Sequence, residues 1–365
     1  MIETARKIGM WNVFFMLLLS IVLYTHVLLI PALVIKAGRD AWVGLLIATA
    51  IMFLWLWMIS WISKRVKQEP IPLWISRRFG FGMRYLITVP LALCIFVMNW
   101  VTYKDTISWS HATYLPYTPP FILALLLGLI CYWACSVGVR TIAFTAGILG
   151  PLVMLCGLFI MSANMPKKHY SMLLPFLEHG MAPVWQCVWD ALGGWMELFM
   201  VVLLQQYIAP KVKINFLNLA MFNVVMMVIT MGPLMGAVSA FGLQEAINQR
   251  YPAFEQWRIV QIGKYIEHLD FLSIFQWLSG AFIRISLFGF LIMDLFLIRG
   301  QKQRRVFLAV LFLLLIIVTL LPISDLTFFN LVVKYYTVLV LCIFCGATVI
   351  LFLLSILPNR QEGRS

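Results

Sequence analysis

The chain has 365 residues, of which 63% are hydrophobic and 11% are charged, and its mean hydropathy is +0.95. This composition excludes a soluble globular domain and indicates a polytopic membrane protein. The formal net charge of +13 would suit a nucleic-acid partner, but the basic residues lie in short loops between apolar runs, so we expect no nucleic acid and a lipid bilayer instead.

Ten apolar segments are long enough to cross a bilayer as helices. In chain order they cover residues 9–35, 42–62, 85–109, 119–138, 141–162, 183–208, 214–242, 270–298, 306–322 and 331–356. The sequence therefore predicts an all-α protein that forms one polytopic membrane domain over residues 1–365.

The basic residues predict the orientation of these spans. Of the 27 Lys and Arg residues, seventeen fall in the loops and ends that are cytoplasmic if the N-terminus is inside, and seven fall in the opposite loops. The positive-inside rule then places both termini in the cytoplasm. Ten spans also divide into two halves of opposite topology, 9–162 and 183–356, which predicts an inverted repeat of the transporter type with a binding site where the first helix of each half is broken.

Span 1 carries one polar cluster, formed by Tyr24, Thr25 and His26, a few residues before Pro31. Proline removes a backbone donor, so we expect an interruption of the helix here. His26 either contacts a ligand or satisfies a hydrogen bond to a neighbouring helix. In span 3, Asn99 is polar at central depth and faces either the site or an adjacent helix.

The loop between spans 2 and 3, residues 63–84, mixes apolar side chains with six basic ones. This pattern is typical of an amphipathic segment that lies on anionic lipid or against a partner subunit.

Span 6 contains the most unusual stretch of the chain, with Gly193, Gly194, Trp195 and Glu197 inside an apolar run. Paired glycines weaken a helix by about 1 kcal/mol each and a carboxylate at mid-bilayer is costly, which predicts a break at Gly193–Gly194 beside a ligand site. Glu197 either contacts the ligand or gates the protein, or it forms a structural ion pair. Trp195 either stacks on the ligand or packs against protein and lipid.

Arg284 lies about fourteen residues into span 8, at a depth similar to that of Glu197. A buried guanidinium needs an acidic partner, and Glu197 and Asp190 are the nearest by depth. We expect Asp190 to be in a solvated vestibule or at the ligand, Lys104 and Asp105 to reach the outer interface, and Asp294 to pair with Arg299.

Signatures of catalysis are missing from the sequence. It has no glycine-rich phosphate loop, no paired-aspartate protease pattern and no His/Glu metal pair on one helix face. The seven cysteines lie mostly in apolar spans, where they pack as small apolar residues. We therefore expect no enzyme, no cofactor and no metal.

The segment from Arg250 to Trp277, together with Gly194-Trp-Met-Glu197 and Ala37-Gly-Arg-Asp-Ala-Trp42, resembles the B subunits of spore germination nutrient receptors. These belong to the amino acid–polyamine–organocation superfamily, and the resemblance covers essentially the whole chain. It implies a leucine-transporter-like fold and a multi-pass protein of the spore inner membrane. It also implies a small nutrient ligand (an amino acid, sugar or nucleoside) and two partners, an A-type membrane subunit and a C-type lipoprotein.

The chain departs from the superfamily in span 1, where Tyr24 and His26 occupy positions that are glycine in many members, ahead of Pro31. In sodium-coupled relatives, span 8 lends hydroxyl residues to a cation site next to span 1. Arg284 in that span is a candidate to replace the cation, and a structural salt bridge is the alternative. We expect a nutrient receptor whose site draws on spans 1, 3, 6 and 8, and the alternative is a proton-coupled permease of amino acids or small solutes.

Overall fold

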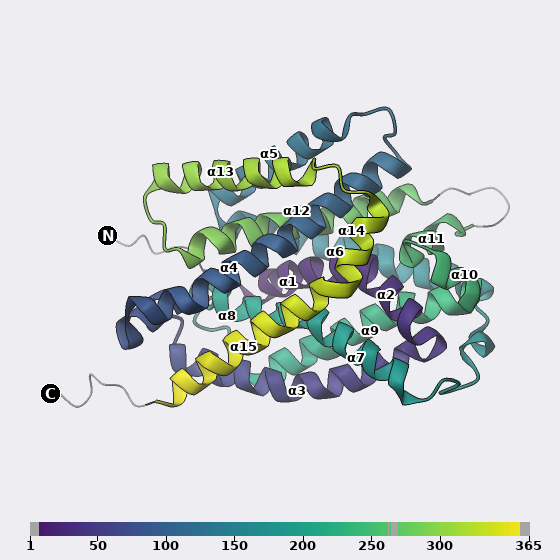
Figure 1. Ribbon diagram of the computed structural model, residues 1–365, viewed down its shortest axis with the longest axis horizontal. Coiled ribbons are helices and arrows are strands. Elements are labelled where there is room, and N and C mark those ends of the chain that lie inside the picture. Colours follow the sequence, from purple (N-terminus) through teal and green to yellow (C-terminus); the bar gives the residue numbers. More distant parts are fainter. Residues whose placement is uncertain (1–6, 262, 264–268, 358–365) are drawn as a thin grey trace.

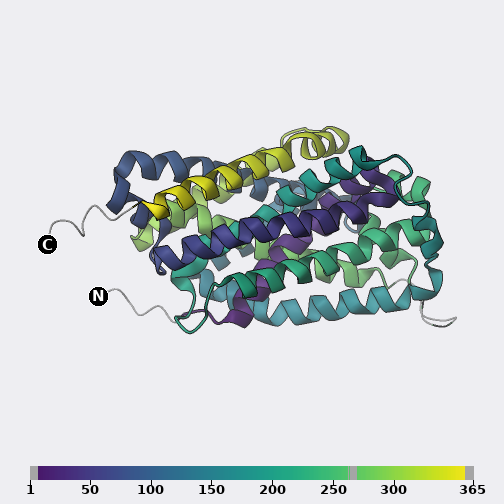
Figure 2. The same ribbon diagram turned by 90° about the horizontal axis from the view of Figure 1, so that it is seen from below.

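The computed structural model describes residues 7–261, 263 and 269–357, so part of the segment from Arg250 to Trp277 lies outside the described residues. Within these residues the chain is helical, with a single isolated bridge between Ile8 and Ile208 and no extended strand. The helices form one bundle in which the first helix, α1, runs through the middle (Figures 1 and 2).

The first half of the chain begins with three segments that follow one another without a loop: α1 (Met10–Tyr24), the π-turn η1 (Thr25–Leu29) and α2 (Ile30–Ala37). After a short 3-10 turn, η2 (Gly38–Asp40), it continues as α3 (Ala41–Val66), α4 (Ile71–Thr113), α5 (Pro120–Val137) and α6 (Val139–Ala163). Two further 3-10 turns, η3 (Met165–Lys167) and η4 (Tyr170–Leu173), lead to the second half.

The second half starts with α7 (Met181–Trp195), the 3-10 turn η5 (Met196–Phe199), α8 (Met200–Leu204) and the 3-10 turn η6 (Gln205–Tyr207). It continues as α9 (Phe216–Phe241), the short helices α10 (Leu243–Asn248) and α11 (Pro252–Arg258), α12 (Phe271–Leu295) and α13 (Gln301–Thr319). It ends with α14 (Asp325–Leu331), the π-turn η7 (Val332–Tyr336) and α15 (Thr337–Ile356).

Local chemistry explains several of these helix ends. The Asn215 side chain accepts a hydrogen bond from the Asn218 amide (2.9 Å) and so caps the start of α9, and Ser324 caps α14 in the same way. Gly38 has a φ of 55°, a conformation that favours glycine, and the chain reverses there between α2 and α3 (Figure 2).

Eight helical stretches of the described residues are long and apolar enough to cross a membrane, which supports the predicted membrane class. One of them, Met10–Val66, has 57 residues, about 85 Å at ~1.5 Å per residue, and it contains the reversal at Gly38. A further helix, α13, begins with Lys302, Arg304 and Arg305 and is otherwise apolar. Each of the ten predicted spans overlaps one of these helices; the count of ten crossings and their orientation stay predictions.

Burial separates central helices from peripheral ones. In Met181–Tyr207 the most apolar window of 18 residues is 94% buried, whereas in α6 it is 17% buried. The former stretch therefore lies inside the bundle, and α6 presents most of its surface outward.

The first helices of the two halves, α1–η1–α2 and α7–η5–α8–η6, pass each other in opposite directions. At one end the Ile8 amide donates to the Tyr207 carbonyl (2.8 Å), and at the other end Lys36 and Asp190 form an ion pair (2.6 Å). Between these ends, Tyr24 lies against Gly194. The candidate site lies at this crossing.

The amphipathic segment predicted between spans 2 and 3 includes the start of α4. Ile71, Trp74 and Ile75 are buried and Arg77 is exposed, and the helix is interrupted at Gly80, where φ is 85°. Its contact with lipid or a partner subunit stays a prediction.

Candidate functional site

Arg284 and Glu197 meet at the centre of the bundle. Both side chains are 0% exposed, and the guanidinium binds both carboxylate oxygens, with Nη2 2.6 Å from Oε1 and Nη1 bonded to Oε2. Arg284 comes from the middle of α12 and Glu197 from the 3-10 turn that interrupts the second half's first helix. The arginine thus takes Glu197, and not Asp190, as its partner.

Three other groups bind the same guanidinium. Its Nε donates to the Thr102 hydroxyl (2.7 Å), Nη1 donates to the Ser20 carbonyl (2.7 Å), and Nη2 donates to the Tyr336 hydroxyl (3.1 Å). The Tyr336 hydroxyl also donates to Glu197 Oε1 (3.3 Å). We call these five residues (Ser20, Thr102, Glu197, Arg284 and Tyr336) the central network.

The central network joins both halves of the chain. Ser20 and Thr102 belong to α1 and α4, and the other three residues belong to η5, α12 and η7. Because a buried ion pair is stable only when its remaining donors and acceptors are also satisfied, this set of partners is what allows two charges to stay inside the bundle.

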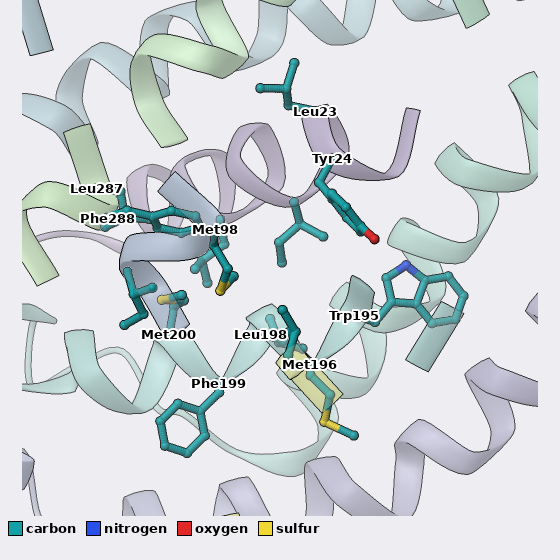
Figure 3. Close-up of a cluster of buried hydrophobic side chains, with 14 of the residues drawn as sticks. Leu23, Tyr24, Met98, Trp195, Met196, Leu198, Phe199, Met200, Leu287 and Phe288 are labelled. Carbon is teal, nitrogen blue, oxygen red and sulfur yellow. The ribbon is translucent and has the colours of Figure 1, made fainter. Parts of the chain in front are cut away.

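Aromatic side chains surround the pair. The guanidinium carbon of Arg284 lies 4.5 Å from the ring centre of Phe288 and 5.6 Å from that of Tyr24. The rings of Tyr24 and Tyr336 are 4.9 Å apart. Figure 3 shows the Tyr24 hydroxyl turned toward the indole of Trp195, whose Nε1 is buried and has no hydrogen-bond partner among the described residues.

The predicted break at Gly193–Gly194 is wrong in its position. Helix α7 continues through both glycines and changes to a 3-10 turn only at Met196. A Cβ on Gly193 would lie 2.6 Å from the Thr337 carbonyl oxygen, and one on Gly194 would lie 3.0 Å from the Tyr24 ring. The glycines are therefore needed for close packing against α15 and Tyr24.

Span 1 is also interrupted, but the interruption is a π-turn and the helix is not unwound. The residues from Thr25 to Leu29 form a π-turn, and the residues at its two ends keep right-handed helical angles. Because residues two apart on a helix point to different sides, Tyr24 and His26 diverge. Tyr24 faces the central network, whereas His26 lines a separate apolar cavity.

Two further predicted site residues, Thr25 and Asn99, do not belong to the central network. The Thr25 hydroxyl donates to the Val22 carbonyl of its own helix (3.1 Å). Asn99 donates to the Ile285 carbonyl of α12 (3.4 Å), one turn of α4 away from Thr102, and its Oδ1 has no partner among the described residues.

Two acidic residues differ from their predicted environments. Asp105 is buried and binds Arg250 (2.7 Å) and Tyr251 (3.2 Å), because the segment after α10 folds back over the end of α4. Asp294 accepts hydrogen bonds from Tyr207 and Gln206 (2.5 Å each) and not from Arg299.

Reasoning from the sequence missed Ser20, Thr102 and Tyr336. Thr102 follows Asn99 by three residues on one helix face, and that spacing was a usable signal for a polar stripe. A backbone carbonyl such as that of Ser20, or one tyrosine among several, carries no such signal.

Comparisons with known proteins agree with this architecture. A family model described as spore germination protein matches residues 7–326. Spore germination protein XB of Bacillus anthracis is 41% identical over 304 residues, which cover 83% of this chain and 85% of that protein.

Two solved structures share this fold at low sequence identity. A substrate-bound, outward-open Na⁺-coupled sialic acid symporter has a TM-score of 0.60 and 14% identity, with 93% of this chain and 78% of that chain covered. MhsT in complex with L-phenylalanine has a TM-score of 0.64 and 10% identity, with 96% and 99% covered. The predicted leucine-transporter-like fold is confirmed.

Proposed function

Because the chain belongs to the spore germination protein family, we propose that it is the membrane subunit of a spore nutrient receptor. It binds a small nutrient at the centre of the bundle and passes a change of conformation to an A-type membrane subunit and a C-type lipoprotein. Its place is the spore inner membrane.

The central network carries this proposal. Four segments from both halves of the chain (α1, α4, η5 and η7) bind the fully buried guanidinium of α12, so opening the site requires these segments to rearrange together. Breaking one side of a buried ion pair costs about 3–5 kcal/mol. If the closed and open states of the site differ in free energy by that amount, a ligand shifts the equilibrium between them only when its binding free energies for the two states differ by a comparable amount. A receptor that is switched by nutrient binding has this property.

The chemistry of the network favours a ligand with both an anionic and a cationic group, such as an amino acid. Arg284 offers donors to a carboxylate, and Glu197 offers acceptors to an ammonium group. A zwitterion that takes the place of each partner leaves both charges compensated. Nearby, the buried indole Nε1 of Trp195 offers one more donor.

A fixed arginine also supports sensing in preference to ion-coupled transport. Arg284 binds the Ser20 carbonyl of α1 with a charge that cannot leave the protein, whereas a coupling ion must bind and dissociate in every cycle. Uptake in vesicles tests this point. With a panel of radiolabelled amino acids and an imposed proton gradient, we expect saturable binding of at most one molecule per chain and no accumulation.

The alternative is a proton-coupled permease. The observation that favours it is the shared fold with a Na⁺-coupled symporter. Accumulation of an amino acid above the number of protein chains, abolished by collapse of the proton gradient, would establish the permease and refute the receptor.

A further inference from the structure

A cavity of about 190 Å³ lies beside α1, on the side away from the central network. Its walls come from α1, α6, α9, α11 and α12, and most of its lining side chains are apolar, among them Leu19, Leu23, Val27, Met154 and Phe254. None of the five residues of the central network is among the lining residues. This cavity is therefore separate from the candidate nutrient site.

The polar side chains at its wall have partners within the protein. His26 Nδ1 lies 3.0 Å from the Val22 carbonyl, Gln276 Nε2 donates to the Val153 carbonyl (3.0 Å), and Gln256 Nε2 donates to the Pro233 carbonyl (2.9 Å). Few groups remain to hold a polar molecule, so the cavity suits an apolar one. Engineered apolar cavities of about 150 Å³ bind benzene, and this one is slightly larger.

The bilayer offers a route to this cavity. Leu158 and Met161 of α6 line it and are 60% and 40% exposed on the outer surface of the bundle. Because α6 is mostly outward-facing, these side chains contact lipid when the protein is in a membrane. A small apolar molecule dissolved in the bilayer therefore meets the α6 wall directly.

The cavity lies against the part of α1 that the central network holds from the other side. Leu19, Val22, Leu23, His26 and Val27 line the cavity along one face of α1 and its π-turn. Tyr24 of the same segment points the other way, to Arg284 and Tyr336. A molecule that fills the cavity would therefore oppose any movement of α1 away from the network.

We propose that this cavity is a binding site for a small apolar molecule, of the size of a substituted benzene, that reaches it from the bilayer. Its occupancy holds α1 in the arrangement described above. Binding is independent of the proposed receptor function, whereas its effect on nutrient sensing rests on that function.

Photolabelling of the full-length protein in nanodiscs tests the binding. The probe is 3-trifluoromethyl-3-phenyldiazirine, a small apolar aromatic, and adducts are located by mass spectrometry of peptides. We expect adducts on the buried residues Leu19, Leu23 and Val27, and an excess of trifluorotoluene should reduce these adducts at least fivefold. Adducts on Leu313 of α13, which is 58% exposed and does not line the cavity, should remain. Adducts confined to exposed residues, or insensitive to trifluorotoluene, would overturn the proposal.

Two matched glycine variants locate the site. A side chain at Gly157 projects toward the cavity, where a Cβ would have only Gln276 Nε2 within 4 Å (3.9 Å), and a Cβ at Gly346 on α15 would have no atom within 4 Å. Gly157→Leu should reduce the buried adducts at least fivefold, and Gly346→Leu should leave them unchanged. Equal labelling of both variants would contradict the assigned site.

The effect on sensing has its own readout. In spores, Gly157→Leu should act as a permanent occupant and raise the nutrient concentration needed for half-maximal germination by at least threefold relative to Gly346→Leu. If labelling follows the expected pattern but this concentration does not change, the binding site stands and its coupling to the receptor is refuted.

Discussion

Replacing Glu197 by glutamine should destabilise the protein strongly, because it leaves the Arg284 guanidinium buried without a counter-charge. Both side chains are fully buried, so water cannot compensate the lost carboxylate. We expect Glu197→Gln to lower the free energy of unfolding by about 3–5 kcal/mol. Reversible unfolding in mixed SDS micelles, followed by far-UV circular dichroism, measures the change.

The double variant Glu197→Gln/Arg284→Met separates the charge effect from loss of packing. It removes both charges and leaves only hydrogen-bonding groups such as the Thr102 hydroxyl without Arg284, at about 1 kcal/mol each. The double variant should therefore be more stable than Glu197→Gln alone.

A matched control uses an exposed ion pair. Glu255 and Arg258 lie three residues apart on α11 at 3.1 Å, and Arg258 is well exposed, so Glu255→Gln should cost less than about 0.5 kcal/mol. A loss below about 1 kcal/mol for Glu197→Gln, or a double variant no more stable than the single one, would refute the reasoning.

Three further substitutions test the site's geometry. Gly193→Ala should lower stability by about 1–3 kcal/mol, since its Cβ meets the Thr337 carbonyl oxygen, while Gly346→Ala should be neutral or slightly stabilising; unfolding in mixed micelles compares them. Tyr336→Phe removes a hydroxyl that binds both members of the buried ion pair and should cost about 1 kcal/mol in the same assay; no change would show that these bonds are not formed. His26→Gln should leave the set of effective nutrients unchanged in a germination assay over an amino-acid panel, because His26 lines the apolar cavity beside α1; an altered set would place it at the nutrient site.

The sequence was sufficient for the helices, and it limited the partner of Arg284 to Glu197 or Asp190. Long apolar runs have one stable form in a bilayer, so each predicted span overlaps a helix. A buried arginine needs an acidic partner, and depth in the span left Glu197 and Asp190 as the candidates; the structure shows that the partner is Glu197.

The sequence was insufficient to predict which neighbouring helix each side chain of a span contacts. The polar cluster of span 1 predicts an unwound segment that groups Tyr24 and His26, but the chain keeps helical angles at both ends of its π-turn, and the two side chains point to different sides. Gly193 and Gly194 were interpreted as a break, yet the neighbours that need their missing Cβ atoms, Thr337 and Tyr24, come from distant parts of the chain. Such contacts are set by tertiary packing and have no local signal.

Binding of radiolabelled amino acids to the protein in nanodiscs tests the central claim most directly. The comparison is between the wild type and Glu197→Gln/Arg284→Met, whose fold is checked by its unfolding transition. If the buried ion pair forms the nutrient site, the amino acid that binds the wild type should bind the double variant at least tenfold more weakly. Unchanged affinity in a folded double variant would show that the nutrient binds elsewhere.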